Sequence, residues 1–167
     1  MPKLALLSSG ARRNLSNVPT HVNKKAKELT MKRSANAVWK GSLKEGEGAF
    51  SVASGAIKDL PYSFRTRFEG APGANPEELI AAAHASCFSM ALGAQLGERG
   101  IKPEAVETSC EITFENLTLT KSALTTRVIA PGADAAKVEA AAADAKAGCP
   151  ISKVLKLEIS LTLQITT

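Results

Sequence analysis

Two cysteines, Cys87 and Cys149, have the residue type and the setting that redox chemistry requires. Cys87 falls in an apolar segment, where desolvation raises the pKa of a thiol unless a cation lies nearby. Cys149 precedes Pro150, so it takes the N-cap of a short predicted helix, whose free N–H groups lower a thiol pKa. One buried and one movable thiol suit a cycle in which a sulfenic acid on the first condenses with the second to a disulfide. The alternative interpretation is that both thiols only fill space.

Metal binding is the competing use of these side chains. His84 and Cys87 are three residues apart on one predicted helix face, but only Cys149 or a carboxylate remains to complete four ligands, and no CxxC or second His motif is present. We therefore predict no metal. The sequence also lacks a GxSxG motif and a Gly-rich phosphate loop, which argues against a serine hydrolase or a phosphate-loop enzyme. Cys110 alternates with apolar residues in a predicted strand and is expected to be structural.

A long helix from Asn75 to Gly100 must position Cys87. Asn75 is a favourable N-cap, Glu78 stands where a capping-box carboxylate belongs, and Gly100 ends the helix. Apolar residues occur all round it, which predicts a buried core helix, and they are too few and too mixed with polar residues to span a bilayer. Cys87 lies roughly 16 Å from the helix start, beyond the reach of the helix dipole. A reactive Cys87 therefore needs a positive charge from another element.

The remaining elements predict an α+β domain. Short alternating runs between Ser34 and Phe68 indicate three antiparallel strands. The last of them carries Arg65 and Arg67, which point to the same face because they are two residues apart, so one arginine can be aimed at a site. The rest of the chain predicts a hairpin, a helix, a short helix and a final strand, over residues 105–130, 133–147, 150–156 and 157–165.

Length, cysteine count and charge limit the class of protein. At 167 residues the chain is large enough for one domain with a real core, and three cysteines suit a reducing, cytoplasmic setting better than a disulfide-stapled secreted fold. The net charge of +5 is uneven: residues 1–33 hold eight Lys or Arg and one acid, whereas residues 34–167 hold 13 basic and 15 acidic residues. The body therefore has no basic stripe for nucleic acid.

Residues 1–30 are interpreted as a flexible basic extension that precedes a folded domain over residues 31–167. They are rich in Ser, Asn and Lys and show no lasting apolar period. Arg12 and Arg13, with no acid before Glu28, give the composition of an organelle transit peptide, so targeting is a minor alternative to a cytoplasmic location. A spurious upstream start or a partner-binding arm fits the same composition.

Two segments closely resemble the OsmC/Ohr family of thiol peroxidases: TRFEGAPGANPEELIAAAHASCFSMAL, residues 66–92, and AGCPISKVLKLEISL, residues 147–161. The form AAAHASCFSMAL is nearer to the osmotically inducible OsmC branch, and the resemblance spans about residues 31–167. It implies an α+β fold in which antiparallel sheets pack on a long buried central helix. It also implies two chains intertwined as an obligate homodimer, with two equivalent sites at the subunit interface.

By the same resemblance, Cys87 is the peroxidatic thiol, Cys149 is the resolving thiol, Arg67 activates Cys87, and Glu77 pairs with Arg67. The guanidinium would supply the charge that Cys87 needs, held in place by the carboxylate. The implied activity is reduction of organic hydroperoxides, and less efficiently of hydrogen peroxide, in oxidative and osmotic stress defence. No cofactor is implied beyond an external dithiol, either a lipoylated protein or a thioredoxin-like system, and no nucleic-acid or membrane partner. The alternative is a non-catalytic OsmC-like redox-sensing or binding protein with a regulatory disulfide.

Overall fold

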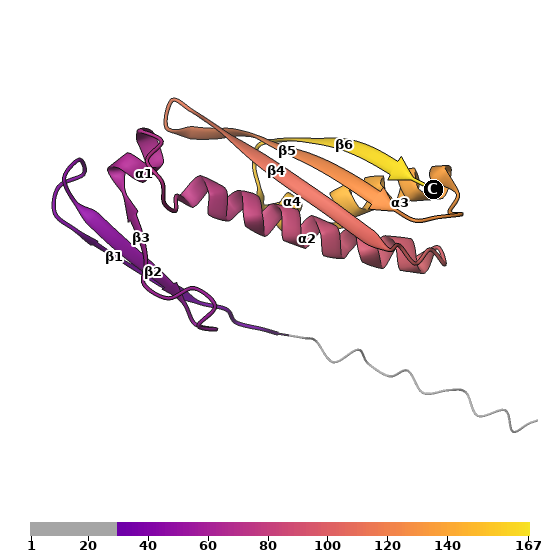
Figure 1. The fold of residues 1–167 in the computed structure, drawn as a ribbon, viewed down its shortest axis with the longest axis horizontal. Helices are drawn as coiled ribbons and strands as arrows, with labels where there is room; N and C mark the ends of the chain where they lie inside the picture. Colours follow the sequence, from indigo (N-terminus) through magenta and orange to yellow (C-terminus); the bar gives the residue numbers. More distant parts are fainter. Residues whose placement is uncertain (1–29) are drawn as a thin grey trace, which may run out of the picture. The chain divides into compact units, whose positions relative to one another are not determined.

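The computed structural model describes residues 30–167, drawn in colour in Figure 1. The predicted extension, residues 1–30, lies outside the described residues except for Thr30. Residues 34–167 form one compact unit. Its elements are β1 (Ala35–Lys40), β2 (Glu47–Val52), β3 (Leu60–Ser63), α1 (Phe64–Phe68), α2 (Pro76–Glu98), β4 (Ala105–Glu115), β5 (Thr118–Ile129), α3 (Ala135–Gly148), α4 (Pro150–Val154) and β6 (Glu158–Thr166).

The strands form two three-stranded sheets, ordered β1-β2-β3 and β4-β5-β6. The first sheet is antiparallel throughout, and β4 and β5 form an antiparallel hairpin. The α+β class predicted from the sequence is confirmed. The expectation of purely antiparallel sheets is wrong for β6, which pairs parallel to β5 with Lys121 opposite Glu158. The reason is the connection: the chain crosses through α3 and α4 before it returns, and such a crossover delivers a parallel strand.

The third predicted strand ends at Ser63, and α1 takes the place of its second half. A capping box turns the chain, because the Ser63 hydroxyl accepts from the N–H of Thr66 at 3.2 Å while the Thr66 hydroxyl oxygen accepts from the N–H of Ser63 at 3.0 Å. The Thr66 hydroxyl also lies 2.9 Å from the carbonyl oxygen of Ala74, which ties α1 to the loop that leads into α2.

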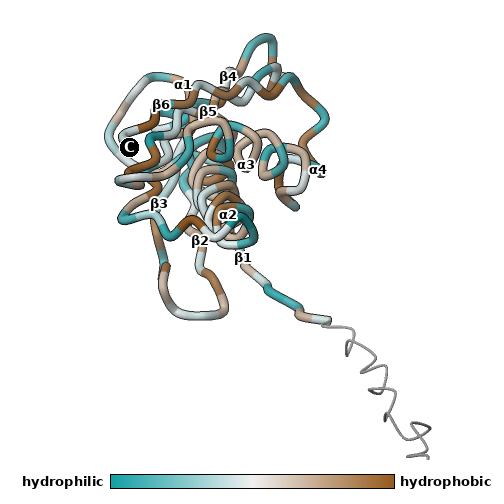
Figure 2. The backbone as a smooth tube through the Cα atoms, turned by 90° about the vertical axis from the view of Figure 1, so that its right-hand side faces the viewer, coloured by the Kyte–Doolittle hydropathy of each residue, from teal (hydrophilic) through white to brown (hydrophobic). Residues whose placement is uncertain are grey.

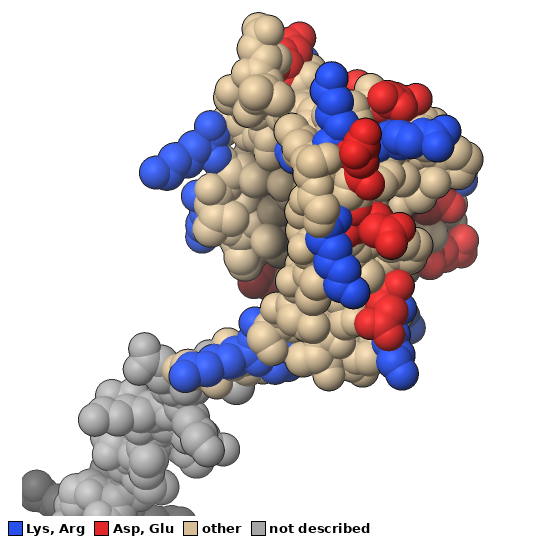
Figure 3. Space-filling view, turned by 90° about the vertical axis from the view of Figure 1, so that its left-hand side faces the viewer, with Lys and Arg blue, Asp and Glu red and all other residues tan. Residues whose placement is uncertain are grey.

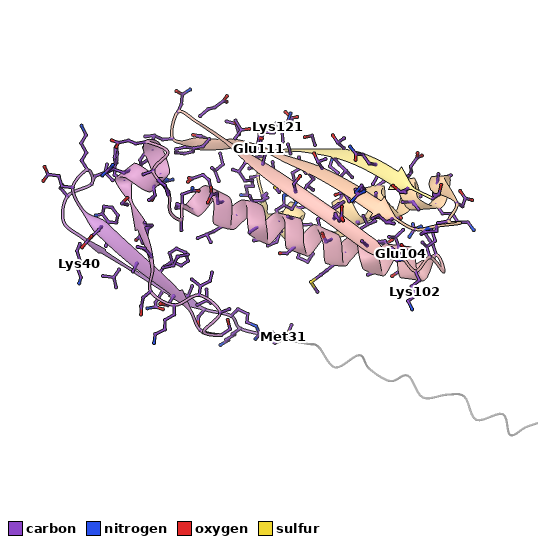
Figure 4. The ribbon with its side chains drawn as sticks, in the orientation of Figure 1. Met31, Lys40, Lys102, Glu104, Glu111 and Lys121 are labelled. Atoms are coloured by element: carbon purple, nitrogen blue, oxygen red, sulfur yellow. The ribbon has the colours of Figure 1, made fainter. Side chains whose placement is uncertain are left out.

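Both predicted ends of α2 are confirmed. The Asn75 side chain accepts from the N–H of Glu78 at 2.8 Å, and Gly100 follows the helix with a φ of 71°, in the left-handed region that glycine adopts without strain. The N–H of Ile101 donates to the carbonyl of Leu96 at 2.9 Å, which closes the C-terminal turn. Lys102 and Glu104 mark the loop that follows, where the chain reverses and β4 runs back along the helix (Figure 4).

The helix α2 is buried along one stripe and not all round. Its fully buried residues, His84, Phe88, Leu92 and Leu96, recur every four residues and face the second sheet and α3. On the opposite side Met90 is 78% exposed and Leu79 is 36% exposed, although Figure 2 shows apolar colouring through most turns. The prediction of burial all round is therefore wrong for the single chain. The helix has the length and composition of a membrane-spanning helix, but its buried stripe packs on β4, α3 and α4.

The core lies between the second sheet and two helices. The helix α2 packs against β4, α3 packs against β6, and the two helices contact each other, so they share one face of the sheet (Figure 1). Because many of the facing residues are alanines, the backbones of α2 and α3 approach closely. The core residues are Phe88, Leu92 and Leu96 from α2, Leu124 and Val128 from β5, and Val138, Ala141, Ala142 and Ala145 from α3.

Surface charges are interspersed and partly paired. Acidic and basic side chains alternate on the face shown in Figure 3. Ion pairs join neighbouring strands, with Arg127 and Glu107 2.7 Å apart and Lys121 and Glu158 3.5 Å apart, and Arg99 pairs with Asp144 between α2 and α3. This face therefore carries no continuous stripe of positive or of negative charge. That the chain has no nucleic-acid partner stays a prediction.

The Thr66→Val substitution tests the capping box. Valine keeps the shape of the side chain but removes the hydroxyl that serves both Ser63 and Ala74, so we expect the free energy of unfolding to fall by about 1 to 2 kcal/mol. Urea unfolding followed by circular dichroism measures it. Thr162→Val, at an exposed position of β6, is the control and should leave stability unchanged. Equal stability of the two variants would show that the hydroxyl of Thr66 does not hold α1.

Candidate active site

The structure brings Cys87 and Cys149 into contact. Cys87 lies near the middle of α2, and Cys149 occupies the corner between α3 and α4. Their sulfur atoms are 3.2 Å apart and both thiols are free. The corner is held by the N–H of Cys149, which donates to the carbonyl of Ala145 at 2.8 Å, and by Pro150, which begins α4.

The exposures of the two thiols are the reverse of the expectation. Cys149 is fully buried, whereas Cys87 is only partly buried because it flanks the open side of α2. The sequence suggested a movable Cys149 because it follows Gly148, but Gly148 is still part of α3 and the core closes over the corner. Close contact between the thiols therefore exists without any rearrangement.

The two thiols differ in acidity. Burial raises the pKa of Cys87, and the nearby Cys149 raises it further, while a hydrogen bond from the N–H of Ile151 opposes the rise. Burial also opposes ionisation of Cys149, but hydrogen bonds from Ser152, Cys87 and the N–H of Ile151 outweigh it and hold the pKa of Cys149 below its ordinary value. Within one chain, Cys149 is thus the thiol with the lowered pKa and Cys87 the one with the raised pKa.

Arg67 and Glu77 form an ion pair between α1 and α2. The Nη2 atom of Arg67 lies 2.7 Å from Oε1 of Glu77, and Nε lies 3.2 Å from the same oxygen. The guanidinium also lies 5.1 Å from the ring centres of Phe68 and Phe114. The prediction that Arg65 and Arg67 share a strand face is wrong, because both lie on α1, and Arg65 pairs with the exposed Glu69 instead.

An apolar cavity adjoins this ion pair. Its volume is about 230 Å³, and Arg67 supplies the charge in its wall. The cavity does not include Cys87 or Cys149. The apolar and aromatic part of its lining comes from Trp39, Leu43, Tyr62, Phe64, Phe68 and Pro76.

The structure does not bring Arg67 to Cys87. Within residues 30–167 the side-chain hydrogen bonds of Arg67 all go to Glu77, and no cation acts on Cys87. Glu77 and Cys87 are ten residues apart on the same helix, which places them about 15 Å apart along its axis. In the single chain the thiol pair and the guanidinium therefore lie at two separate places.

A buried histidine links the thiol pair to the second sheet. His84 is fully buried, with Nδ1 2.7 Å from the hydroxyl of Ser122 and Nε2 2.8 Å from that of Ser152. Burial lowers the pKa of His84. Because both ring nitrogens are engaged by hydroxyls, His84 is not arranged with Cys87 as a metal ligand, and residues 30–167 contain no group of three His, Cys, Asp or Glu suited to a metal.

From the sequence, His84 is expected to be either structural or a residue that supports the site from behind, and neither Ser122 nor Ser152 is identified. The signal available in the sequence is the position of His84, one helical turn before Cys87. The partners come from β5 and α4, 38 and 68 residues away, and no local pattern specifies such contacts. Cys110 also belongs to this cluster, with its sulfur 3.2 Å from the Ser122 hydroxyl, and burial raises its pKa.

Two free thiols thus lie in contact at the edge of the core. Residues 68–164 match the OsmC-like protein family. Two relatives, each named Peroxiredoxin OsmC, from Escherichia coli (strain K12) and Shigella flexneri, are 45% identical over 141 residues, covering 82% of this chain and 99% of theirs. The chain therefore belongs to the OsmC-like protein family, which confirms the resemblance found in the sequence, and it is a peroxiredoxin-like enzyme.

Solved structures support the fold. The organic hydroperoxide resistance protein OhrB of Bacillus subtilis superposes with a TM-score of 0.57 at 22% identity, covering 80% of this chain and 98% of that one. A structure from Legionella pneumophila, described as an organic hydroperoxide resistance protein OsmC, gives a TM-score of 0.58 at 24% identity, covering 80% and 97%. At these identities the likeness concerns the fold alone.

The sulfur contact predicts which cysteines form a disulfide. Treatment of the reduced protein with one equivalent of diamide should link Cys87 to Cys149, because a small approach from 3.2 Å brings the sulfurs to bonding distance. Cys110 should remain alkylatable, since its sulfur faces Ser122 and His84. Peptide mapping by mass spectrometry identifies the linked pair, and a disulfide that contains Cys110 would contradict the arrangement.

Proposed function

We propose that this enzyme reduces organic hydroperoxides, and less efficiently hydrogen peroxide, with Cys87 as the peroxidatic thiol and Cys149 as the resolving thiol, in oxidative and osmotic stress defence. The observation that carries the proposal is the 3.2 Å contact between two free thiols from distant parts of the chain. The names of the relatives support it, since two are peroxiredoxins and a solved structure of this fold is an organic hydroperoxide resistance protein.

The cycle has three balanced steps. The thiolate of Cys87 attacks one peroxide oxygen, the O–O bond breaks, and the departing alkoxide takes up the proton that the thiol released, so the products are a sulfenic acid and an alcohol. The sulfur of Cys149 then attacks the sulfenic sulfur, an S–S bond replaces the S–O bond, and water leaves. An external dithiol, either a lipoylated protein or a thioredoxin-like system, reduces the disulfide by exchange and is itself oxidised. This cycle uses no cofactor.

The cavity beside Arg67 favours an alkyl hydroperoxide. Its wall combines one guanidinium with aromatic and aliphatic side chains, as a substrate with a polar peroxide end and an apolar body requires. Donors of the guanidinium can bind the peroxide oxygen on which negative charge develops as the O–O bond breaks. A small polar peroxide gains less from the same cavity, because it leaves the apolar wall uncovered.

Arg67 reaches the thiols only if a second copy of the chain supplies it. In one chain Arg67 is paired with Glu77, about 15 Å along α2 from Cys87, so it cannot hold that pair and also touch the thiol of the same chain. We therefore propose a homodimer in which the Arg67–Glu77 pair of each chain faces the thiols of the other. The guanidinium would then lower the pKa of Cys87, which burial alone raises.

The open side of α2 is the proposed surface for that second copy. It carries the exposed Leu79 and Met90 together with several small residues, and it adjoins the partly buried Cys87. Burial of such an apolar helix face is favourable in proportion to its area, and small residues allow two helices to approach closely. A symmetric pairing through this face forms two equivalent sites.

The alternative function is a redox sensor in which the same disulfide is a regulatory switch. The raised pKa of Cys87 in the single chain favours it, because a thiol without a cation reacts slowly with peroxide. The two functions differ in turnover. A sensor is oxidised once, whereas a peroxidase consumes peroxide as long as dithiol is supplied.

Turnover of cumene hydroperoxide with excess dihydrolipoamide separates the two functions. We expect the wild type to consume many equivalents, Cys87→Ser to fall to the uncatalysed rate, and Cys149→Ser to accumulate a sulfenic acid that dimedone traps. Equal circular dichroism spectra and equal oligomeric state serve as the controls for folding. Consumption of one equivalent by the wild type, followed by arrest with dithiol still present, excludes the peroxidase.

Mixed dimers test whether Arg67 acts across the interface. Arg67→Ala and Cys87→Ser should each be inactive as homodimers, but co-refolding equal amounts should restore about a quarter of wild-type activity, because half of the dimers then contain one site with an intact Arg67 and an intact Cys87. The matched control mixes Arg67→Ala with the double variant Cys87→Ser/Arg67→Ala and should stay inactive. An inactive first mixture that nevertheless forms dimers would place Arg67 within its own chain's site.

A further inference from the structure

An aromatic ring from the second sheet lies against the guanidinium of Arg67. The ring centre of Phe114, on β4, is 5.1 Å from Cζ of Arg67, and that of Phe68, on α1, is at the same distance. The two ring centres are 6.1 Å apart, far less than twice their distance to Cζ, so both rings lie on one side of the guanidinium. A cation this close to aromatic rings is attracted to them.

The end of the β4–β5 hairpin brings Phe114 to α1. Thr113 lies opposite Lys121 in the ladder, whereas Phe114 lies opposite Leu119. Thr120 is therefore an extra residue on β5. Such a bulge bends the strand that carries it and increases the local twist, and bulges often re-aim a side chain next to a site. Figure 1 shows the end of this hairpin beside α1, in agreement with the aromatic contact.

Arg67 keeps one edge of its guanidinium available. Nε and Nη2 lie 3.2 Å and 2.7 Å from the carboxylate oxygen Oε1 of Glu77. Within residues 30–167 the hydrogen bonds of this side chain all use these two nitrogens, so the two hydrogens of Nη1 remain available. The side chain is 37% exposed and lines the apolar cavity. Nη1 is therefore the donor from which a peroxide oxygen in this cavity can accept.

The ion pair alone does not fix the direction of that edge. Arg67 and Glu77 both have long, rotatable side chains, so the paired groups can swing together on their stems. Phe68 does not prevent this motion, because it belongs to α1 and moves with Arg67. The helix α1 has only five residues, and none of them is buried. Phe114 comes instead from the sheet that forms the core, so its ring ties the guanidinium to the rigid part of the chain.

We propose that Phe114 is a positioning residue for peroxide reduction, which holds the guanidinium of Arg67 with Nη1 directed at the peroxide. The inference rests on the proposed function, because it takes Arg67 as the group that binds the peroxide oxygen. Phe114 and Arg67 belong to the same chain, so the role of the ring is the same whichever chain supplies the reacting thiol. A guanidinium that is held in place needs no reorientation as negative charge develops on the leaving oxygen.

The two half-reactions of the cycle separate this role from a general effect on folding. Phe114→Leu keeps an apolar side chain but removes the ring, so the guanidinium spends less time in the productive position. We expect kcat/KM for cumene hydroperoxide to fall about three- to fivefold, the size of a cation–π attraction at a partly exposed site. The value for dihydrolipoamide, which reduces the disulfide without using Arg67, should stay at that of the wild type. Thr113→Val, whose side chain points to the opposite face of β4, is the control and should leave both constants unchanged.

Fluorinated phenylalanines in place of Phe114 test the electrostatic attraction itself. Monofluoro-, difluoro- and trifluorophenylalanine keep the shape of the ring but progressively weaken the negative potential of its face. The kcat/KM for the peroxide should fall in that order, whereas Phe114→Tyr, which keeps the ring, should retain most of the wild-type value. In single turnovers with excess peroxide, Arg67→Ala should be slower than Phe114→Leu, and the double variant no slower than Arg67→Ala, because the ring acts through the guanidinium.

Equal peroxide constants in Phe114→Leu and an active wild type overturn the proposal and leave the peroxidase function standing. A parallel fall of the peroxide and dithiol constants also overturns it, because it indicates a general loss of folded enzyme. A wild type that does not turn over overturns the proposed function and the role of Phe114 with it. Should Phe114→Leu fail to fold, the fluorinated variants decide the question, because a trifluorinated ring with the wild-type constant excludes the attraction.

Discussion

The length of one helix separates the charged half of the site from the thiol half. Glu77 stands in the first turn of α2 and Cys87 near its middle, and a rigid rise of about 1.5 Å per residue holds them apart. The capping box of α1 and the Thr66 contact to the loop then place Arg67 beside Glu77. No local adjustment closes this gap within one chain, so in our proposal the active site is a property of the dimer.

The thiol half depends on how the last third of the chain returns to α2. The alanine-rich α3 packs closely on α2, its end at Gly148 delivers Cys149 into the core, and Pro150 begins the short helix α4 directly after it. Neutral hydrogen-bond donors therefore lower the pKa of Cys149. Burial raises the pKa of Cys87, and in our proposal only a nearby cation lowers it. The crossover that builds this corner is also what makes β6 parallel to β5.

Local signals in the sequence identified most elements, and the family resemblance is what selected the proposed site residues. Alternation predicted β1, β2 and β6, and the caps at Asn75 and Gly100 predicted both ends of α2. The α1 turn was missed because its capping box uses Thr66, where Glu or Gln is the usual signal. Which face of α2 is covered, which thiol is exposed, and what His84 contacts were not readable, since each depends on residues far away in the chain or on a second copy.

The contact between the two sulfurs in the reduced protein also affects which of two reactions a sulfenic acid on Cys87 undergoes. In the proposed cycle a sulfenic acid on Cys87 reacts either with Cys149 or with a second peroxide molecule. The second reaction gives a sulfinic acid, which simple thiols do not reduce. A neighbour already in place reacts without a diffusional encounter, which corresponds to an effective concentration far above that of any peroxide in solution. If the proposed cycle operates, the packing of the α3–α4 corner thereby protects the enzyme from inactivation by its own substrate.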